Sequence, residues 1–335
     1  MQFQFLGTSA GMPTLQRNVT ALAVSIENQH NWYLVDCGEG TQQRMLQAGL
    51  NVLRLKTIFI THIHGDHCYG LPGLLASANM NNRQEPLTVC APAGIEEYVR
   101  AVFQHTDVHD LRYPLHFLRS DTPDFSYMDN VIHAEAIALS HRVPSFAYRI
   151  EERLTYYPLD KNRLLDAGIP PGPAWGELQK GNSINLDDGR EIHPQSVCSG
   201  SAKKRAIIVG GDNDQPSLLQ AAMQRSDVLI HEATFTESVL EKIGPKYMHS
   251  TAAAVAKAAQ EAGIAHLLLT HISQRYSANS NKPDNSLKAL RNEAEREYEG
   301  NLLLAEDMAC YQLHSDGTLT EVNKQSASGK NSKAK

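Results

Sequence analysis

The chain has 335 residues, 41% of them hydrophobic and 20% charged, which is typical of a globular protein with one large α/β domain or two modest ones. A formal net charge of −6 argues against a protein that coats nucleic acid through its overall charge, although a local basic patch stays open. Five scattered cysteines without a Cys-x-x-Cys pair favour a reducing compartment, and no stretch reaches the roughly 20 apolar residues of a membrane span, so we expect a cytoplasmic protein without membrane contact.

Strands and helices alternate along the first third of the chain. Apolar and β-branched runs predict strands at 2–6, 20–26, 32–35 and 87–90, and helical composition predicts helices at 41–47, 71–80 and 94–104. This alternation favours a layered α/β architecture.

The segment 56–67 combines a predicted buried strand with four possible metal ligands. His62 and His64 are two residues apart, so in an extended segment both imidazoles point to the same side. We expect Gly65 to let the backbone turn sharply, so that Asp66 and His67 face a second point. Imidazole and carboxylate groups at this density indicate a site for zinc or a similar divalent ion. The alternative is a polar loop whose histidines happen to cluster.

Four later apolar runs also end in residues that bind metal or move protons. The runs at 136–140, 206–209, 227–230 and 266–270 are followed by His141, by Asp212, by His231 and Glu232, and by His271. Strand ends on one rim of a sheet lie side by side, so these side chains can converge on one site. Taken alone, Asp212 would more often be a turn residue, and His141 or His271 a surface or hydrogen-bonded histidine.

Two regions depart from this alternation. Residues 151–205, which we call the arm, include a short helical piece at 162–167, a Gly/Pro-rich stretch at 168–173 and a hairpin pattern at 183–193. Such a segment adds little to a core and is expected to project from it. Residues 321–335 are predicted to form a disordered tail, which leaves 1–320 as one domain with the arm inserted in it.

The candidate ligands are too many for one tetrahedral ion. Two ions that share a carboxylate would use them all, and two metals about 3.5–4 Å apart suit hydrolysis at phosphorus. The candidate ligands are His62, His64, Asp66, His67, His141, Asp212 and His271.

The pattern His-x-His-x-Asp-His at 62–67, with the later His, Asp and His, resembles the metallo-β-lactamase superfamily. More narrowly, the chain resembles the ribonuclease Z family of tRNA 3′-processing endoribonucleases, also called tRNase Z or ribonuclease BN. The narrower resemblance covers the chain from Phe5 to about Gln312 and is carried by residues 5–13, 17–18, 36–42, 61–73, 172–173, 176–178, 231–235, 249–251 and 269–276.

The resemblance implies a four-layer αβ/βα sandwich with a protruding arm and two zinc ions per subunit. One zinc would take His62, His64 and His141, the other would take Asp66, His67 and His271, and Asp212 would bridge them. Asp66 would also act as general base, and His249, assisted by Glu232, would donate a proton to the leaving 3′-oxygen. Arg275 would contact the phosphate.

His249 can also be weighed from its own surroundings. It precedes Ser250, Thr251 and a predicted alanine-rich helix at 252–262. A helix N-terminus disfavours an imidazolium, so an acid there needs a counter-charge, which Glu232 would supply. The alternative is that His249 merely flanks the helix cap.

For the arm, the resemblance implies a site that grips the tRNA elbow from the partner subunit of a homodimer. Gly172 and Pro173 carry this match, and Lys180, Lys203, Lys204 and Arg205 could meet phosphates. The alternative is a solvated loop with ordinary charges, since the arm also holds acidic residues. The chain departs from the family pattern at Asn213, where the family usually has Thr, and at Gln179, which separates Leu178 from Lys180.

These patterns predict a zinc-dependent endoribonuclease that removes 3′ trailers from precursor tRNA and leaves a 3′-hydroxyl on the tRNA and a 5′-phosphate on the trailer. One alternative is a broader phosphodiesterase or thioesterase of the same fold that acts on small molecules. Another is an RNA-binding protein without catalysis.

Overall fold

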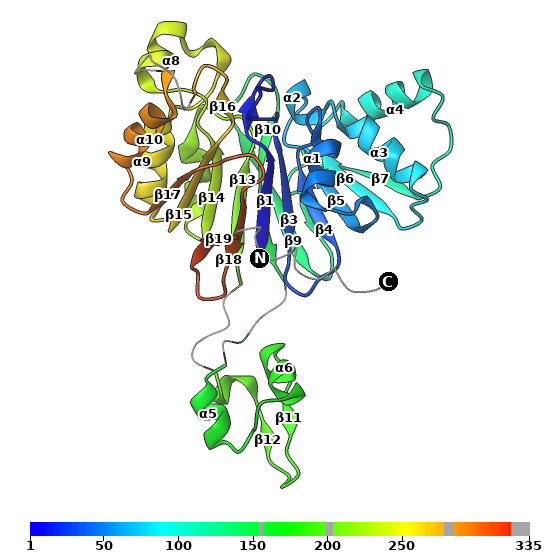
Figure 1. Cartoon of the computed structure of the whole chain (residues 1–335), viewed down its shortest axis with the longest axis vertical. Coiled ribbons are helices and arrows are strands. Elements are labelled where there is room, and N and C mark those ends of the chain that lie inside the picture. The colour runs from blue at the N-terminus through cyan, green and yellow to red at the C-terminus, as the bar shows by residue number, and fades with distance from the viewer. Residues whose placement is uncertain (154–156, 158, 199–203, 278–284, 323–335) are drawn as a thin grey trace, which may run out of the picture.

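Two β-sheets stacked face to face form the centre of the molecule, with helices on both outer sides (Figure 1). The computed structural model describes residues 1–153, 157, 159–198, 204–277 and 285–322. The first sheet has the strand order β19-β18-β1-β3-β4-β5-β6-β7, and the second has the order β17-β15-β14-β13-β10-β9-β8. The expected four-layer αβ/βα sandwich is therefore confirmed.

The strands of the first sheet are β1 (Gln2–Gly7), β3 (Ala21–Ser25), β4 (Trp32–Val35), β5 (Leu55–Phe59), β6 (Leu87–Ala91), β7 (Leu115–Arg119), β18 (Cys310–Leu313) and β19 (Leu319–Glu321). Those of the second are β8 (Ser126–Met128), β9 (Ile132–Leu139), β10 (Ser145–Glu152), β13 (Ala206–Gly210), β14 (Val228–Glu232), β15 (His266–Thr270) and β17 (Asn301–Leu304). β2 (Ser9–Ala10) pairs with β16 (Ile272–Ser273).

The helices of the sandwich follow the strands they cover. Beside the first sheet lie α1 (Thr41–Ala48), α3 (Leu71–Met80) and α4 (Ile95–His105), and beside the second lie α8 (Glu237–Ile243), α9 (Ala252–Ala262) and α10 (Leu287–Glu295) (Figure 1). The short helices α2 (Gly65–Cys68) and α7 (Gln220–Met223) complete the set. The predicted strand 32–35 matches β4 in full, and the predicted helices 71–80 and 252–262 match α3 and α9 in full. The remaining predicted helices differ at their ends by one residue.

Neighbouring residues in the central strands face different cores. In β5, Ile58 packs toward α1 and α3, whereas Phe59 packs between the sheets; in β13, Ile207 lies between the sheets and Ile208 faces α9. Both faces of such strands are buried, so their sequences are continuously apolar rather than alternating. This explains why the runs before the candidate ligands are so hydrophobic.

The arm contains α5 (Lys161–Asp166), α6 (Pro173–Gln179), β11 (Ile184–Asn185) and β12 (Glu191–Ile192), and it stands apart from the sandwich (green in Figure 1). It has a small core of its own, formed by Leu164, Ile169, Leu178, Ile192 and Val197. The paired short strands match the hairpin expected at 183–193.

The predicted bounds of the arm, 151–205, are too wide at both ends. β10 continues to Glu152, and the buried Arg205 donates to both carboxylate oxygens of Glu152 at 2.7 Å. Arg205 also donates to Glu27 at 2.7 Å, so it belongs to the sandwich and is not available to tRNA phosphates. Lys203 lies outside the described residues.

The predicted start of the tail also needs adjustment. Glu321 is the last residue of β19, and the backbone N–H of Val322 donates to Cys310 at 2.7 Å. Residues 323–335 lie outside the described part of the chain. Among the helices that the structure describes, none is both long and apolar enough to cross a membrane.

Candidate metal centre and active site

Loops at the ends of four strands bring the candidate ligands to one edge of the sandwich. His62 and His64 follow β5, His141 follows β9, Asp212 follows β13 and His271 follows β15. The strand-end pattern in the sequence therefore gives real spatial neighbours, although the strands belong to two different sheets.

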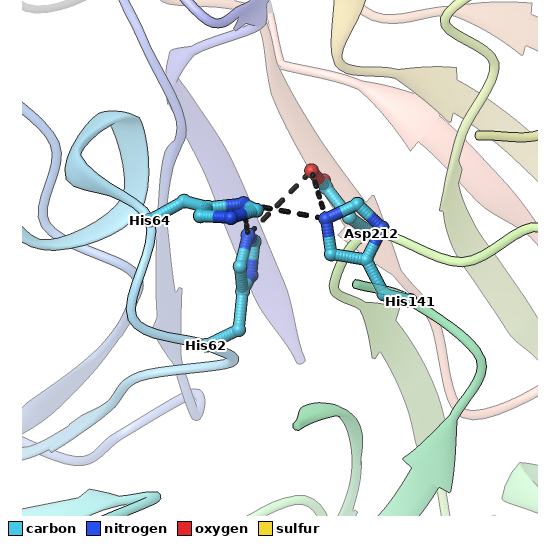
Figure 2. A group of neighbouring side chains, drawn as sticks. All are labelled: His62, His64, His141 and Asp212. Carbon is cyan, nitrogen blue, oxygen red and sulfur yellow. Dashed lines mark hydrogen bonds and ion pairs between the residues drawn. The ribbon is translucent and has the colours of Figure 1, made fainter. Parts of the chain in front are cut away.

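The first group of ligands surrounds the Oδ2 oxygen of Asp212 (Figure 2). His64 Nδ1 lies 3.1 Å from His62 Nε2 and 3.3 Å from His141 Nε2. Asp212 Oδ2 lies 3.5 Å from His62 Nε2 and 3.6 Å from His141 Nε2. Three ring nitrogens and one carboxylate oxygen thus point at a common centre.

The second group surrounds the other oxygen of the same carboxylate. Asp212 Oδ1 lies 3.4 Å from His67 Nε2 and 3.3 Å from His271 Nε2. Asp66 Oδ2 lies 3.2 Å from His271 Nε2 and 3.6 Å from His67 Nε2. Asp212 therefore faces one group with each of its oxygens, as expected for a shared ligand.

These distances fit a bound cation. Zinc bonds of about 2.0–2.1 Å in a tetrahedron place the ligand atoms roughly 3.3–3.4 Å apart, close to the separations in both groups. Asp212 Oδ1 is buried and accepts no hydrogen bond, although buried carboxylate oxygens are normally satisfied. The donor set and this unsatisfied oxygen both fit divalent metal ions.

The charge balance of the site also favours a cation. Burial lowers the pKa of His62 and His141 and brings that of His64 to about 4, so these rings are neutral and able to bind metal. At His67 burial has the same tendency, but the carboxylates of Asp36, Asp66 and Asp212 outweigh it and raise the pKa. The three carboxylates around His67 thus make the site negative, and a bound cation would neutralise this charge.

Hydrogen bonds on the outer side of the rings fix which nitrogen faces the centre. His67 Nδ1 donates to Asp36 Oδ2 at 2.7 Å, and His141 Nδ1 donates to the carbonyl of Met248 at 2.9 Å. Each bond leaves Nε2 with its lone pair toward the ligand group. Asp36 also accepts from the backbone N–H and the hydroxyl of Thr61, at 2.8 and 2.9 Å.

Three residues of the centre hold strained backbone conformations. Asp36, Met248 and His271 have φ angles of 59°, 53° and 52°, in the left-handed region that non-glycine residues rarely adopt. Such strain is held in place by the surrounding structure and is common at functional sites.

Gly65 lies at the predicted turn, where the extended backbone of His64 gives way to helix α2. It is the first residue of helix α2, and a Cβ there would lie 2.1 Å from the ring of Tyr69. The glycine therefore makes room for a side chain at the rim of the site.

Glu232 and His249 form a hydrogen-bonded pair next to the metal ligands. His249 Nδ1 lies 3.0 Å from Glu232 Oε1, and the buried Glu232 also accepts from the backbone N–H of Asn213 at 3.0 Å and from Thr234. Burial opposes a charged His249, but the Glu232 carboxylate outweighs it and raises the pKa of His249 to about 9. The pair thus keeps a proton on His249.

A cavity of about 670 Å³ opens over the centre. Its lining includes Asp66, His249 and Arg275, together with the exposed Arg142 and Lys246. Arg275 Cζ lies 5.4 Å from the centre of the Phe235 ring, and its Nε donates to Ser273 at 3.2 Å.

Comparisons with known proteins agree with this geometry. A ribonuclease Z from Marinobacter nauticus is 47% identical over 324 residues, which cover 96% of this chain and 99% of that protein. The chain belongs to the ribonuclease Z family. The structure of the short form of human tRNase Z matches with a TM-score of 0.61 at 23% identity, over 94% of this chain and 100% of that one.

Two further matches describe the fold beyond the ribonuclease Z family. The metallo-β-lactamase fold protein YhfI from Bacillus subtilis matches with a TM-score of 0.61 at 17% identity, over 92% of this chain and 98% of that one. The family described as Anti-Pycsar protein Apyc1 matches residues 1–106 only. The full-length ribonuclease Z relative disfavours the two alternative functions.

The structure brings most of the predicted site residues of this ribonuclease Z family member together. The seven predicted ligands, with Glu232 and His249, form one continuous cluster, and Arg275 lies in the wall of the cavity. Gly172, Pro173 and Lys180 lie around α6 in the arm, away from the cluster (Figure 1). Lys180 Nζ is 2.8 Å from Glu177 Oε1.

Sequence reasoning missed the residues that orient the ligands. Asp36 follows β4 as the ligands follow their strands, so the strand-end pattern was a usable signal for it. Thr234 Oγ1 lies 3.0 Å from His271 Nδ1 and follows Glu232 closely in the sequence. Met248 acts through its carbonyl, which the identity of a side chain does not reveal.

Proposed function

We propose that this chain is a metal-dependent endoribonuclease that removes 3′ trailers from precursor tRNA and leaves a 3′-hydroxyl on the tRNA and a 5′-phosphate on the trailer. The observation that carries the proposal is the position of Asp212 between two ligand groups, beside the Glu232–His249 pair. Membership of the ribonuclease Z family supplies the substrate class.

The proposed cofactor is zinc, with two ions per subunit. His62, His64 and His141 would hold one ion, Asp66, His67 and His271 the other, and Asp212 both; five imidazoles and two carboxylates without thiolate suit catalytic zinc. When bound, these ions would neutralise phosphate charge and make water a better nucleophile at neutral pH.

Asp66 is the proposed general base. Its Oδ2 accepts a hydrogen bond from the backbone N–H of Gly11 at 2.8 Å, which holds the carboxylate toward the cavity. The neighbouring histidines outweigh burial and lower the pKa of Asp66, so the carboxylate is ionised. Its place in the cavity lining, rather than its pKa, supports its role as the proton acceptor.

His249 is the proposed proton donor to the leaving 3′-oxygen. Its Nδ1 is engaged by Glu232, so Nε2 is the nitrogen available to substrate. Glu232 is anchored by Asn213 and Thr234, and it both orients the ring and stabilises the protonated form. The arrangement is that of an acid held in position by a carboxylate.

Arg275 is the proposed contact to a substrate phosphate, because its guanidinium lies in the cavity wall and can offer several N–H donors. The arm, through Gly172, Pro173 and Lys180, is proposed to bind the body of the tRNA bound to the partner subunit of a homodimer in the cytoplasm. Figure 1 shows the arm at the end of the molecule away from α2 and α8, the helices that contribute Asp66 and Ile243 to the cavity lining, which is compatible with such use in trans.

The decisive experiment incubates the purified protein with precursor tRNA labelled at either end, with and without a chelator. We expect one cut at the 3′ trailer, a 3′-hydroxyl on the body, and loss of cleavage on chelation that added zinc restores. His64→Ala and Asp66→Ala should abolish cleavage while the circular dichroism spectrum is kept. Cleavage that persists after rigorous removal of metal would overturn the proposal, as would tight tRNA binding without any product in the presence of zinc.

A further inference from the structure

The cavity over the metal ligands is basic, although the chain as a whole carries a net charge of −6. Three cations, Arg142, Lys246 and Arg275, line the cavity. Among the described residues of its lining, Asp66 is the one acidic side chain. A local concentration of cations in an acidic protein indicates a polyanionic ligand in this cavity.

Two pairings of cation and aromatic ring lie near His249. In the first pairing, Lys246 Nζ and Arg142 Cζ lie 4.8 and 5.9 Å from the centre of the Tyr247 ring. In the second, Arg275 Cζ lies over the Phe235 ring, whose centre is 5.8 Å from that of the His249 ring. Both rings line the cavity, but Phe235 is 6% exposed and packs in a hydrophobic core cluster, whereas Tyr247 is 39% exposed.

An exposed aromatic ring among cations is the arrangement by which proteins hold single-stranded nucleic acid. The ring accepts the flat face of a base, and the cations bind the phosphates on either side. Stacking is tolerant of base identity, because every base has such a face. Tyr247 therefore suits a nucleotide whose base differs from one tRNA to another.

The position of His249 decides which nucleotide this is. In the proposed reaction the oxygen that leaves is the 3′-oxygen of the nucleotide on the 5′ side of the cut, and His249 protonates it. That nucleotide must lie on the His249 side of the cavity, where Tyr247 is. The trailer then leads away from His249, in a cavity whose lining also includes Gly11, which donates to Asp66, and Tyr69, which lies beside Gly65.

We propose that Tyr247 stacks on the base of the nucleotide immediately 5′ of the cut, and that Arg142 and Lys246 bind the phosphates next to it. This subsite would place the 3′-oxygen of that nucleotide within reach of His249. The inference rests on the proposed function, since it takes its direction from the identity of the leaving oxygen.

The test pairs Tyr247 variants with precursor tRNAs that lack one base. Three substrates are needed: the intact precursor, one that is abasic at the nucleotide 5′ of the cut, and one that is abasic at the first trailer nucleotide. With the intact precursor, Tyr247→Ala should lower kcat/KM about 5- to 150-fold, the usual range for loss of one stacked base. Tyr247→Phe should stay within about twofold, because the ring is kept.

The abasic substrates identify the partner of the ring. Tyr247→Ala should have almost no further effect on the precursor that lacks the 5′-side base, and its full effect on the one that lacks the trailer base. Tyr69→Ala, which removes another exposed tyrosine of the cavity lining, is the matched control. Whatever change in kcat/KM it causes on the intact precursor should be the same on the precursor that lacks the 5′-side base. Metal content and melting temperature of each variant show whether the centre has survived.

The outcomes separate the two proposals. The subsite is wrong if wild-type protein cleaves the precursor and Tyr247→Ala cleaves it equally well. It is also wrong if Tyr247→Ala lowers kcat/KM by the same factor on both abasic substrates. An effect that vanishes only with the trailer base would place the ring on the other side of the cut and would also overturn it. If wild-type protein does not cleave precursor tRNA at all, the proposed function itself fails.

Discussion

Asn213 donates a hydrogen bond from Nδ2 to Nε2 of His231, at 3.0 Å, in the buried floor of the active site. His231 Nδ1 donates to the carbonyl of Glu232 at 2.7 Å, so its Nε2 is the acceptor and the orientation of the Asn213 amide is fixed. Asn213 Oδ1 in turn accepts from the backbone of Ser140 at 3.2 Å. One side chain thus ties the loop before His141 to the strand that carries Glu232.

The resemblance to the ribonuclease Z family led us to expect Thr at position 213, and we predict that Asn213 positions the candidate ligands around it. Asn213→Ala should lower the free energy of unfolding by about 1–3 kcal/mol for each buried group left without a partner, and should reduce kcat more than KM. Asn213→Thr should recover part of both, because a hydroxyl can replace one of the bonds but cannot span both. Chemical denaturation and steady-state cleavage measure the two effects. Full activity of Asn213→Ala would contradict the prediction.

His249 should matter only when the leaving group needs a proton. The 3′-oxygen of a ribonucleotide leaves as a strong base, whereas p-nitrophenolate leaves without protonation. We therefore expect His249→Ala to lower precursor tRNA cleavage about 10²- to 10⁴-fold, and hydrolysis of bis(p-nitrophenyl) phosphate far less. Glu232→Gln should show the same selectivity with a smaller loss. Equal losses on both substrates would instead indicate that the variant disturbs the centre as a whole.

Metal content should depend on Asp212 more than on any single histidine. Its two oxygens face different ligand groups, so Asp212→Ala should weaken both proposed zinc sites, whereas His141→Ala should weaken one. Elemental analysis after dialysis against limiting zinc measures the ratio of metal to protein. His109→Ala, which removes an exposed histidine paired with Asp107, is the control and should bind as the wild type does. Indistinguishable losses in Asp212→Ala and His141→Ala would argue against a shared carboxylate.

The strand-end pattern identified the candidate ligands because the position of the residue that follows a buried strand is set by backbone geometry. A buried strand must be apolar, and the first polar residue after it lies at the edge of the sheet, so His141, Asp212 and His271 were visible as a set. The pattern could not show that Asp212 faces both groups, since this depends on how the two sheets stack. Helix α2 escaped prediction because four residues are too few for a periodic signal.

The bounds of the arm were misjudged because charged residues can end a buried strand when they are paired. Glu151 and Glu152 resemble the start of a loop, but Glu151 Oε2 lies 2.6 Å from Arg149 and Glu152 Oε2 lies 2.7 Å from Arg205. Arg205 is far from Glu152 in the sequence, and nothing in the sequence shows that Arg149 pairs with Glu151. These ion pairs therefore cannot be inferred from composition. A buried charge with a hydrogen-bonded partner is tolerated where an isolated one is not.

The Arg205 cluster should make stability depend on acid pH. Partial burial tends to raise the pKa of Glu27, but the hydrogen bond and charge of Arg205 outweigh it and lower the pKa below the usual 4.5. The stabilisation is therefore present above the unfolded-state pKa and is lost as pH falls through the folded one. The melting temperature of Glu27→Gln should lie below that of the wild type at pH 7, and the difference should shrink toward pH 3. The exposed Glu85→Gln should show no such difference, and a gap that stays constant down to pH 3 would contradict the assignment.

Removal of the arm should separate substrate binding from chemistry. The chain leaves and re-enters the sandwich at adjacent positions, since the backbone N–H of Glu152 donates to the carbonyl of Arg205 at 3.0 Å. A short Gly/Asn turn can therefore replace residues 153–204 and close β10 onto β13, which pair antiparallel. We expect this variant to keep its melting transition, its metal content and its hydrolysis of bis(p-nitrophenyl) phosphate, but to lose most precursor tRNA cleavage through a raised KM. A milder variant, Lys180→Ala with Glu177→Gln, removes one ion pair of the arm. Because one positive and one negative charge are lost together, the net charge of the arm is unchanged. A raised KM for precursor tRNA in this variant would therefore reflect the loss of the Lys180 contact rather than of overall charge. Undiminished cleavage of precursor tRNA by the arm-deleted protein would show that the sandwich alone recognises its substrate.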